Sequence, residues 1–329
     1  MSEILNIGVI GLGVMGQRML ARLAGHPRLR VAAVWDADPA ALARTLQAQP
    51  QLQPQAADSA AALIATPGLA SVYIATPPGP HMALAELAFD AGLAVFCEKP
   101  LTVDLDAARR AIARIQAEGQ RAAVNFALAS SAGLALLQTH FGAASHLPLG
   151  ALREVELELA FAAWPRPWQA AAGAWLGERA EGGFSREVLS HFIFALQRVL
   201  GMTRVRAAVA SFPADGIGAE TALRAELDAS GVPVRISGRV GGQVPDLNRM
   251  IWRTGEGEIE LSEWFGQVQQ RGRELAKPFG AADEVRRAGQ ADQLEQWVAL
   301  IEGRSHSLPG FAEALAVQET IEALLANRQ

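Results

Sequence analysis

A glycine-rich turn near the N-terminus constrains the fold more than any other feature of this sequence. It has the spacing G-x-G-x-x-G and consists of Gly11, Leu12, Gly13, Val14, Met15 and Gly16. The turn follows an apolar, β-branched run at residues 4–10 and opens a helical pattern at 15–23. In this context the first glycine permits a tight turn, the second lets the backbone approach a pyrophosphate, and the third lets the helix pack on the strand. The segment therefore predicts a strand–turn–helix unit whose helix start binds a dinucleotide.

An acidic residue ends the second apolar run. Asp36 follows residues 29–35 and stands about 20 positions after Gly16. A carboxylate at this place accepts hydrogen bonds from the ribose hydroxyls of NAD and repels the 2′-phosphate of NADP. We therefore expect NAD(H) as the cofactor, with NADP the weaker candidate. The competing interpretation is that Asp36 and the glycines are ordinary turn residues.

Strands and helices alternate over the first third of the chain. The predicted strands are 4–10, 29–35, 71–75, 94–97 and 122–126, with a weaker candidate within 53–58. Helical patterns connect them at 15–23, 39–46, 80–91 and 105–117. Such alternation is typical of βαβ units, and near-continuous apolar strands are typical of a parallel sheet covered on both faces. Residues 1–123 are thus predicted to form a doubly wound Rossmann domain in an α/β protein.

The pattern changes after about residue 126. Apolar and polar residues alternate with period two over 152–161 and again in five later stretches, which are 205–212, 222–227, 232–240, 248–253 and 258–264. Helices are expected at 131–141, 187–200, 283–301 and 310–326. This pattern predicts a second domain over 124–329, an α+β domain with a large, mainly antiparallel open sheet.

Composition narrows the classes of protein to consider. The formal charge is −5 and the basic residues form no stripe or run, which argues against a nucleic-acid partner. Cys97 is the only cysteine and no two histidines have metal-ligand spacing, so no metal site is expected. No uncharged apolar run reaches the roughly 18 residues of a membrane span, and no signal-peptide pattern is visible. We expect a small-molecule substrate, no membrane partner and a cytoplasmic location.

Polar residues follow two of the predicted strands. Thr76 and Pro77 come after the third strong strand and lead to His81 at a helix start, so this turn is a candidate to lie over the cofactor. Glu98 and Lys99 end the strand at 94–97. A lysine at this sheet edge is able to hydrogen-bond the oxygen of a reacting alcohol or carbonyl. The alternatives are a structural His81 and a surface Lys99.

Lysine is scarce in this chain, which weakens the surface interpretation of Lys99. Lys99 and Lys277 are the only lysines among 29 basic residues. Lysine, unlike arginine, is able to release its proton in a protein. The positive charge of a nicotinamide ring and partial burial would both favour the neutral amine of Lys99.

Together these motifs resemble the Gfo/Idh/MocA oxidoreductases. The residues that carry the resemblance are the glycine turn, Asp36, Thr76-Pro77 with His81, and Glu98-Lys99-Pro100. The resemblance implies a Rossmann domain joined to an α/β domain that binds substrate and mediates oligomerisation. It implies Lys99 as the catalytic lysine, and a homodimer or homotetramer formed through the second sheet. Members of the family mostly oxidise or reduce sugars, inositols and related alcohols.

The resemblance also points to a helix in the second domain. The family tends to carry a glycine-rich stretch followed by Asp and, four residues later, His. In residues 182–191 of this chain His191 falls in place, whereas Glu187 stands where Asp is usual. His191 would then be an acid/base partner of Lys99 or a donor that orients substrate, with Glu187 holding its ring. The alternative is a solvated polar stripe on an amphipathic helix.

This chain departs from the family pattern at two further places. Pro78 stands where asparagine is usual, and residues 127–129 lack an arginine often found there. The substrate pocket is therefore expected to be unusual. Tyr73 is the only tyrosine and no lysine lies four residues on, which excludes a Tyr-x-x-x-Lys dehydrogenase.

A tryptophan-rich segment precedes the glycine stretch. Trp164 and Trp168 are candidates to stack on a sugar ring, and Arg166 or Arg186 to hold a carboxylate through two parallel hydrogen bonds. The competing interpretation is that the tryptophans cover the junction between the domains.

The leading functional hypothesis is NAD(H)-dependent hydride transfer at a secondary alcohol or carbonyl of a sugar, inositol or related polyol. Two alternatives stay open at this point. One is an NAD-dependent glycosidase without net redox change. The other is a cofactor-bound sensor or regulatory protein without turnover.

Overall fold

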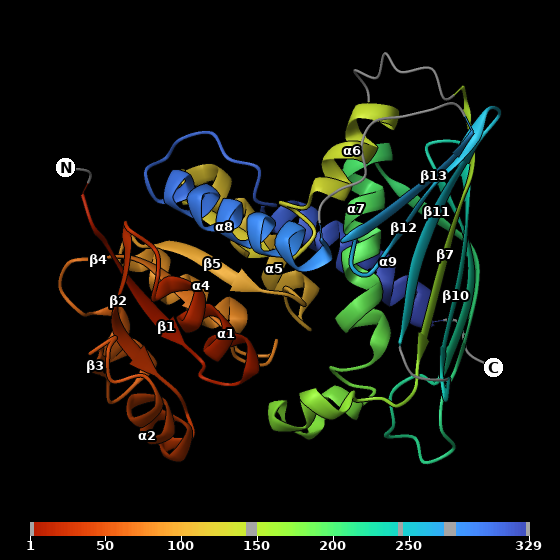
Figure 1. The fold of residues 1–329 in the computed structure, drawn as a ribbon. Coiled ribbons are helices and arrows are strands. Elements are labelled where there is room, and N and C mark those ends of the chain that lie inside the picture. Colours follow the sequence, from red (N-terminus) through yellow and green to blue (C-terminus); the bar gives the residue numbers. More distant parts are fainter. Residues whose placement is uncertain (1–2, 143–149, 243–245, 273–280, 327–329) are drawn as a thin grey trace. The chain divides into compact units, whose positions relative to one another are not determined.

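The computed structural model describes residues 3–142, 150–242, 246–272 and 281–326 (Figure 1). Its contacts divide the chain into two units, Met1–Phe126 with Ala291–Leu315 and Ala127–Gln290 with Ala316–Gln329. The sequence pattern predicted that all residues after 123 belong to the second domain. Residues 291–315 group with the first unit because Trp297 and Val298, both 0% exposed, pack into the core of its sheet.

The first unit is built on a six-stranded parallel sheet in the order β3-β2-β1-β4-β5-β6. Its strands are β1 Leu5–Ile10, β2 Leu29–Trp35, β3 Gln55–Ala56, β4 Leu69–Ile74, β5 Ala94–Glu98 and β6 Ala122–Asn125. Its helices are α1 Val14–Leu23, α2 Pro39–Ala48, α3 Ala60–Ile64, α4 His81–Asp90 and α5 Leu105–Glu118. This is the doubly wound Rossmann order, and ligands bind such sheets where the strand order reverses, between β1 and β4.

Local side-chain chemistry sets the ends of these helices. The carboxylate of Asp38 accepts a hydrogen bond from the Ala40 N–H at 2.9 Å and begins α2. Asp104 begins α5 in the same way, and Gly119 ends it in the left-handed conformation. A carboxylate at a helix start satisfies N–H groups that lack a partner within the helix.

One face of the parallel sheet is covered partly by a helix from far along the chain. Met19 and Leu20 of α1 share a core cluster with Trp297 of α8, Ala282–Ile301. The Trp297 ring packs against Phe96 and Tyr73 with centroids 5.1 and 5.9 Å away. Its indole N–H also donates to Ser71 Oγ at 3.0 Å. The last third of the sequence therefore completes the first core.

The second unit contains a seven-stranded sheet in the order β13-β12-β11-β7-β10-β9-β8. Its strands are β7 Leu152–Phe161, β8 Thr203–Ser211, β9 Ala222–Ala229, β10 Val232–Val240, β11 Leu247–Thr254, β12 Gly257–Ser262 and β13 Gln267–Gly272. β7 and β10 pair in parallel and the other pairs are antiparallel, which confirms the predicted mainly antiparallel sheet. β13 was not predicted, because its sequence QVQQRG carries a single apolar residue and shows no alternation.

The two faces of this sheet have different environments. Figure 1 shows α6 Ala132–Phe141, α7 Ser190–Leu200 and α9 Phe311–Ala326 along one face. Inward side chains such as Leu157 and Leu227 are buried beneath them. The other face carries cross-strand ion pairs, including Arg249–Glu158 at 2.7 Å and Arg253–Glu156 at 2.6 Å.

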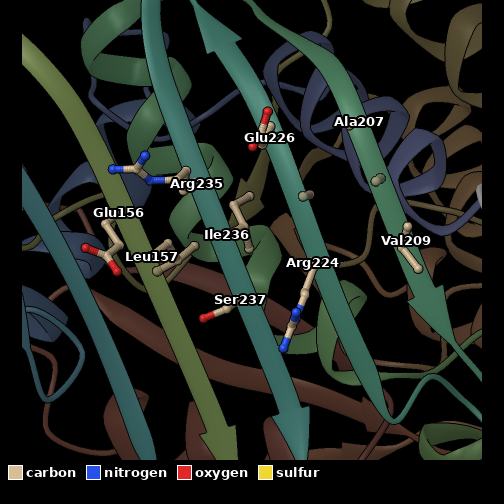
Figure 2. Close-up of a pocket in the computed structure, with 11 residues that line it drawn as sticks. Glu156, Leu157, Ala207, Val209, Arg224, Glu226, Arg235, Ile236 and Ser237 are labelled. Carbon is tan, nitrogen blue, oxygen red and sulfur yellow. The ribbon is translucent and has the colours of Figure 1, made fainter.

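A hollow of about 390 Å³ lies on that charged face, across β7, β10, β9 and β8. Figure 2 shows residues that line it. Glu156, Arg224, Glu226 and Arg235 are among its lining residues, together with the small side chain of Ala207. The sheet thus has one packed face and one face that presents charge. None of the described helices has the length and apolar character needed to span a membrane.

The segments that lead into α7 are short and irregular. They are the 3-10 helices η1 Pro167–Ala172 and η2 Ala174–Gly177 and the π-helical turn η3 Ser185–Leu189. The sequence predicted a single α-helix over 187–200. The structure instead has a π turn followed by α7 from Ser190, a feature that often marks functional positions.

Candidate cofactor and substrate sites

The glycine turn has the shape that a dinucleotide requires. Gly11 has φ of +92°, and a Cβ there would lie 2.6 Å from the backbone of Ala75. A Cβ on Gly16 would lie 2.0 Å from the carbonyl oxygen of Gly11. A Cβ on Gly13, by contrast, would meet nothing within 4 Å. Two glycines are therefore needed for packing, and the third leaves open space where a pyrophosphate would approach the backbone.

Asp36 lies beside this turn. Its Oδ2 accepts a hydrogen bond from the Leu12 N–H at 2.6 Å, and its Oδ1 accepts one from the Asp38 N–H at 2.8 Å. The two bonds fix the carboxylate at the sheet edge next to the glycines. A carboxylate has about four acceptor positions, so a ribose hydroxyl still finds one.

Thr76 follows β4 at the same sheet edge. Its hydroxyl oxygen is buried and has no hydrogen-bond partner among the described residues. Buried hydroxyls are normally satisfied, so such an atom marks a place where a ligand group fits. With the open space at Gly13, it supports the fit of this edge to a nicotinamide dinucleotide.

His81 supports the turns rather than facing a ligand. Its ring is 0% exposed, with Nε2 2.9 Å from the Thr76 carbonyl oxygen and Nδ1 3.0 Å from that of Pro100. Burial lowers the pKa of His81, although the carbonyl groups oppose this. The predicted direct cofactor contact is therefore corrected: the ring braces the turn after β4 against the turn after β5.

Glu98 and Lys99 end β5 above a buried polar network, which comprises Tyr73, Glu98, Asn125 and Gln293. The hydroxyl of Tyr73 donates to Glu98 Oε1, and the Asn125 amide donates to the same oxygen at 2.8 Å. Gln293 of α8 donates to Asn125 Oδ1 at 2.8 Å. The Lys99 backbone N–H donates to Glu98 Oε2 at 3.2 Å. Four distant segments thus fix the backbone that carries the half-buried Lys99.

The network shifts the ionisation of its tyrosine. Burial, and the nearby Glu98 carboxylate, raise the pKa of Tyr73 well above its ordinary value. The hydroxyl therefore keeps its proton for Glu98 throughout the physiological range. The Lys99–Pro100 peptide bond at the end of β5 is cis.

Sheet order brings the predicted residues of the first unit together. β1, β4 and β5 are consecutive neighbours, and their carboxyl ends carry Gly11, Thr76 and Lys99. With strands about 4.8 Å apart, Lys99 follows a strand about 10 Å from the one that ends at the glycine turn. Lys277 lies outside the described residues.

His191 occupies the first turn of α7 in the second unit. Its ring is 5% exposed and meets the edge of Trp264 at a centroid distance of 5.4 Å and an angle of 81°. Glu187 lies one turn earlier, in the π-helical η3. The four-residue spacing between them therefore crosses a change of helix type and does not have the regular α-helical geometry assumed from the sequence.

The structure corrects the prediction that Arg186 binds substrate. Arg186 is 9% exposed, and its guanidinium donates to both carboxylate oxygens of Glu322 at 2.7 and 2.8 Å. A third nitrogen donates to the carbonyl oxygens of Arg179 and Gly182 at 2.9 Å. These bonds occupy the fork that a substrate carboxylate would need, so Arg186 is structural.

The other predicted substrate residues of the second unit lie together. The guanidinium of Arg166 lies over the rings of Trp164 and Trp168, and also over Trp264. Trp264 in turn contacts His191. Sequence reasoning missed Trp264, because it follows a strand far along the chain and has no motif around it.

Among the described residues, no group of three or more His, Cys, Asp or Glu side chains is arranged to hold a metal ion.

Residues 5–126 match the GFO_IDH_MocA family model, described as an oxidoreductase family with an NAD-binding Rossmann fold. The inositol 2-dehydrogenase of Ralstonia nicotianae is 36% identical over 118 residues, which cover 36% of this chain and 35% of that protein. The inositol 2-dehydrogenase of Pseudomonas fluorescens is similar to the same extent over 118 residues. The match therefore spans about a third of the length of these curated relatives.

Solved structures resemble the whole chain in fold. The WlbA dehydrogenase of Chromobacterium violaceum, in complex with NADH and UDP-GlcNAcA, has a TM-score of 0.82 at 18% identity and covers 99% of this chain and 94% of its own. KijD10, a 3-ketoreductase of Actinomadura kijaniata in complex with NADP and TDP-benzene, has a TM-score of 0.78 at 19% identity. The match covers 99% of this chain and 98% of KijD10. At these identities the likeness shows the fold alone.

Proposed function

We propose that this chain is an oxidoreductase of the GFO_IDH_MocA type, which the match of residues 5–126 to the NAD-binding Rossmann fold of that family supports. It transfers a hydride between a nicotinamide cofactor and a secondary alcohol or carbonyl. We propose a sugar, inositol or related polyol as the substrate, which the similarity to inositol 2-dehydrogenases supports. We propose the cytoplasm, where NAD(H) is pooled, as the compartment.

The observation that carries this proposal is the position of Lys99. It follows β5 at the edge where the glycine turn and the buried hydroxyl of Thr76 also lie. The network beneath Glu98 fixes its backbone. An amine held at the cofactor edge of a Rossmann sheet suits proton transfer to or from a reacting oxygen.

Each site residue then has a defined task. Nicotinamide, when bound, accepts or supplies the hydride. Gly11, Gly13 and Gly16, with the helix start at Val14 and Met15, hold the pyrophosphate. Lys99 Nζ hydrogen-bonds the reacting oxygen and holds the transferred proton. His191 shares this proton or orients the substrate, and Glu187 supports it. Thr76 and Pro77 line the cofactor edge.

The position of Asp36 supports NAD over NADP. Its carboxylate is fixed by two backbone N–H groups and would repel a 2′-phosphate. Asp36→Ala should therefore reduce the preference for NAD+ over NADP+, because it removes the charge that repels the 2′-phosphate. Initial rates with NAD+ and NADP+ measure that preference.

We also propose that the charged face of the second sheet joins copies of this chain into a homodimer or homotetramer. That face spans seven strands and carries cross-strand ion pairs and a hollow lined by charged side chains. Sedimentation of the purified chain, and of Arg235→Glu, tests this assignment.

Hydride transfer is tested by absorbance at the NADH band with NAD+ and a panel of inositols, sugars, uronates and dihydrodiols. Lys99→Met removes the amine at similar length, and we expect at least a hundredfold loss of kcat, within the range of general acid–base contributions. Lys99→Arg keeps the charge but not the releasable proton, and should be nearly as slow. NADH binding by both variants is the control for folding.

Two outcomes would assign another function. Substrate consumption without accumulated NADH would indicate a glycosidase that uses NAD transiently. If neither the wild type nor Lys99→Met turned over any substrate, and both still bound the ligand, the protein would be a sensor.

A further inference from the structure

Three of the seven tryptophans gather around a single arginine in the second unit. The guanidinium carbon of Arg166 lies 4.7 Å from the ring centroid of Trp168, 5.6 Å from that of Trp164 and 6.0 Å from that of Trp264. The ring of Phe161 lies at 5.8 Å. Trp168 is 45% exposed, so this cluster presents an aromatic surface to solvent. We call Arg166, Trp164, Trp168 and Trp264 the arginine–tryptophan cluster.

The chain builds the cluster at a cost in backbone conformation. Glu263, Trp264 and Phe265 have φ of 51°, 57° and 62°, three consecutive non-glycine residues in the left-handed region. Such a conformation is strained for a non-glycine residue and persists only where the surrounding packing holds it in place. Here Phe265 is 1% exposed and packs against Phe192, and Asn248 accepts the Trp264 N–H at 2.7 Å. The strain places Trp264 between Arg166 and His191.

The plane of the Arg166 side chain is fixed as well. Gln169 Oε1 accepts hydrogen bonds from the backbone N–H of Arg166 at 3.1 Å and from its Nε at 3.0 Å. A guanidinium held in one plane presents its positive charge at a fixed place, which suits recognition of a carboxylate. The same unit shows this recognition at Arg186, which binds both oxygens of Glu322.

The cluster matches the chemistry of a sugar acid. Tryptophan faces suit the C–H faces of a sugar ring. A guanidinium that is partly shielded from water by aromatic rings gains more from an anion than an exposed one does. His191 contacts Trp264, which puts the cluster beside the residue proposed to share the proton.

We propose that the substrate carries a carboxylate, that Arg166 binds this carboxylate, and that the tryptophans hold the ring of the same molecule. The substrate class is thus a uronic or aldonic acid rather than a neutral polyol. This inference rests on the proposed function for its link to turnover, but binding alone also tests it.

The test compares matched pairs of probes that differ only in the acid. Glucuronate is set against glucose and galacturonate against galactose, with NAD+ for rates and with NADH-loaded protein for binding. Binding is followed by tryptophan fluorescence and calorimetry. We expect wild-type kcat/KM for the acid to exceed that for the matched neutral sugar at least tenfold.

Arg166→Gln removes the charge and should raise the Kd and KM for the acid about 10- to 100-fold, the range for a hydrogen bond to a charged group. The values for the neutral sugar should stay within about twofold. Arg166→Lys keeps the charge without the fork and should lose an intermediate factor. Arg109→Gln, at an exposed arginine of α5, is the matched control and should change neither substrate. Thermal unfolding verifies that each variant is folded.

The outcomes separate this inference from the proposed function. Acid binding that depends on Arg166, without any hydride transfer, supports the inference and contradicts the proposed function. Turnover of neutral sugars with no preference for the acids contradicts the inference and leaves the proposed function standing. Equal losses for acid and neutral sugar in Arg166→Gln, or no acid binding by the loaded wild type, also contradict the inference.

Discussion

The two units each bury a carboxylate, and they hold it in opposite ways. Glu98, 3% exposed in the first unit, accepts hydrogen bonds from Tyr73, Asn125 and the Lys99 N–H. Glu220, 1% exposed in the second unit, accepts one from the Ser185 N–H at 2.6 Å. Its other oxygen, Oε2, is buried with no hydrogen-bond partner among the described residues. One carboxylate is satisfied at both oxygens and the other at a single oxygen.

The satisfied carboxylate of Glu98 stabilises the fold and fixes the local backbone. The half-satisfied carboxylate of Glu220 lowers the stability of the fold. A buried acceptor left unsatisfied costs about 1–3 kcal/mol, whereas a paired one stabilises the fold. Burial accordingly raises the pKa of Glu220, and the hydrogen bonds from Ser185 and from the Glu220 backbone oppose this, as does the charge of Arg186. Glu98 supports the strand end that carries Lys99. Glu220 holds the start of η3, which leads to His191.

The largest expected effect is at Gly183, which makes room for Glu220. Gly183 has φ of +102°, and a Cβ there would lie 2.1 Å from Glu220 Oε2. Gly183→Ala should therefore lower the free energy of unfolding by about 4 kcal/mol, through backbone strain and overpacking together. Urea denaturation measures this.

Gly13→Ala is the matched control from the first unit. A Cβ there meets nothing within 4 Å, so we expect a change in stability of about 0.5 kcal/mol or less but weaker NADH binding. If Gly183→Ala and Gly13→Ala were equally stable, the close approach of Gly183 to Glu220 would not matter to the fold.

Sequence spacing was enough to predict the parts that depend on neighbours along the chain. The glycine turn and Asp36 lie where local patterns put them, because each task needs residues within one turn or strand end. The edge that carries Lys99 followed from the order of parallel strands.

The remaining features depend on residues that meet only in the folded chain. Glu98 is satisfied by Tyr73 and Asn125, with Gln293 supporting Asn125. These four residues come from separate segments, and no local pattern marks Tyr73 for this task. Trp264 depends on a left-handed backbone that propensity disfavours. Long-range packing therefore selected conformations that single-sequence patterns do not specify.

A smaller effect is expected from Tyr73→Phe, which removes one donor from Glu98. The loss of a hydrogen bond to a charged group should lower the free energy of unfolding by about 2 kcal/mol. It should also lower kcat, because the Lys99 backbone loses part of its support. Ser71→Ala in the same strand also breaks buried bonds, to Ala94 and Trp297, but none to Glu98. It should cost about 1 kcal/mol with kcat unchanged. A Tyr73→Phe enzyme with wild-type kcat would show that the network is structural only.

The smallest effect is expected for Glu220→Gln. The pH dependence of its stability tests the contrast between the two buried carboxylates most directly. The folded-state pKa of Glu220 is raised, so the native state binds its proton more tightly than the unfolded chain does. Wild-type stability should therefore fall as the pH rises from the ordinary glutamate pKa to the raised one. Glutamine is neutral at every pH, so the variant should be more stable than wild type by about 1 kcal/mol at pH 8, the scale of one buried unsatisfied acceptor. The difference should vanish or reverse near pH 4, where the wild-type carboxyl is protonated as well. Denaturation of both proteins at a series of pH values measures this difference. If the variant instead lost stability relative to wild type on going from pH 4 to pH 8, the charged form of the buried Glu220 would stabilise the fold.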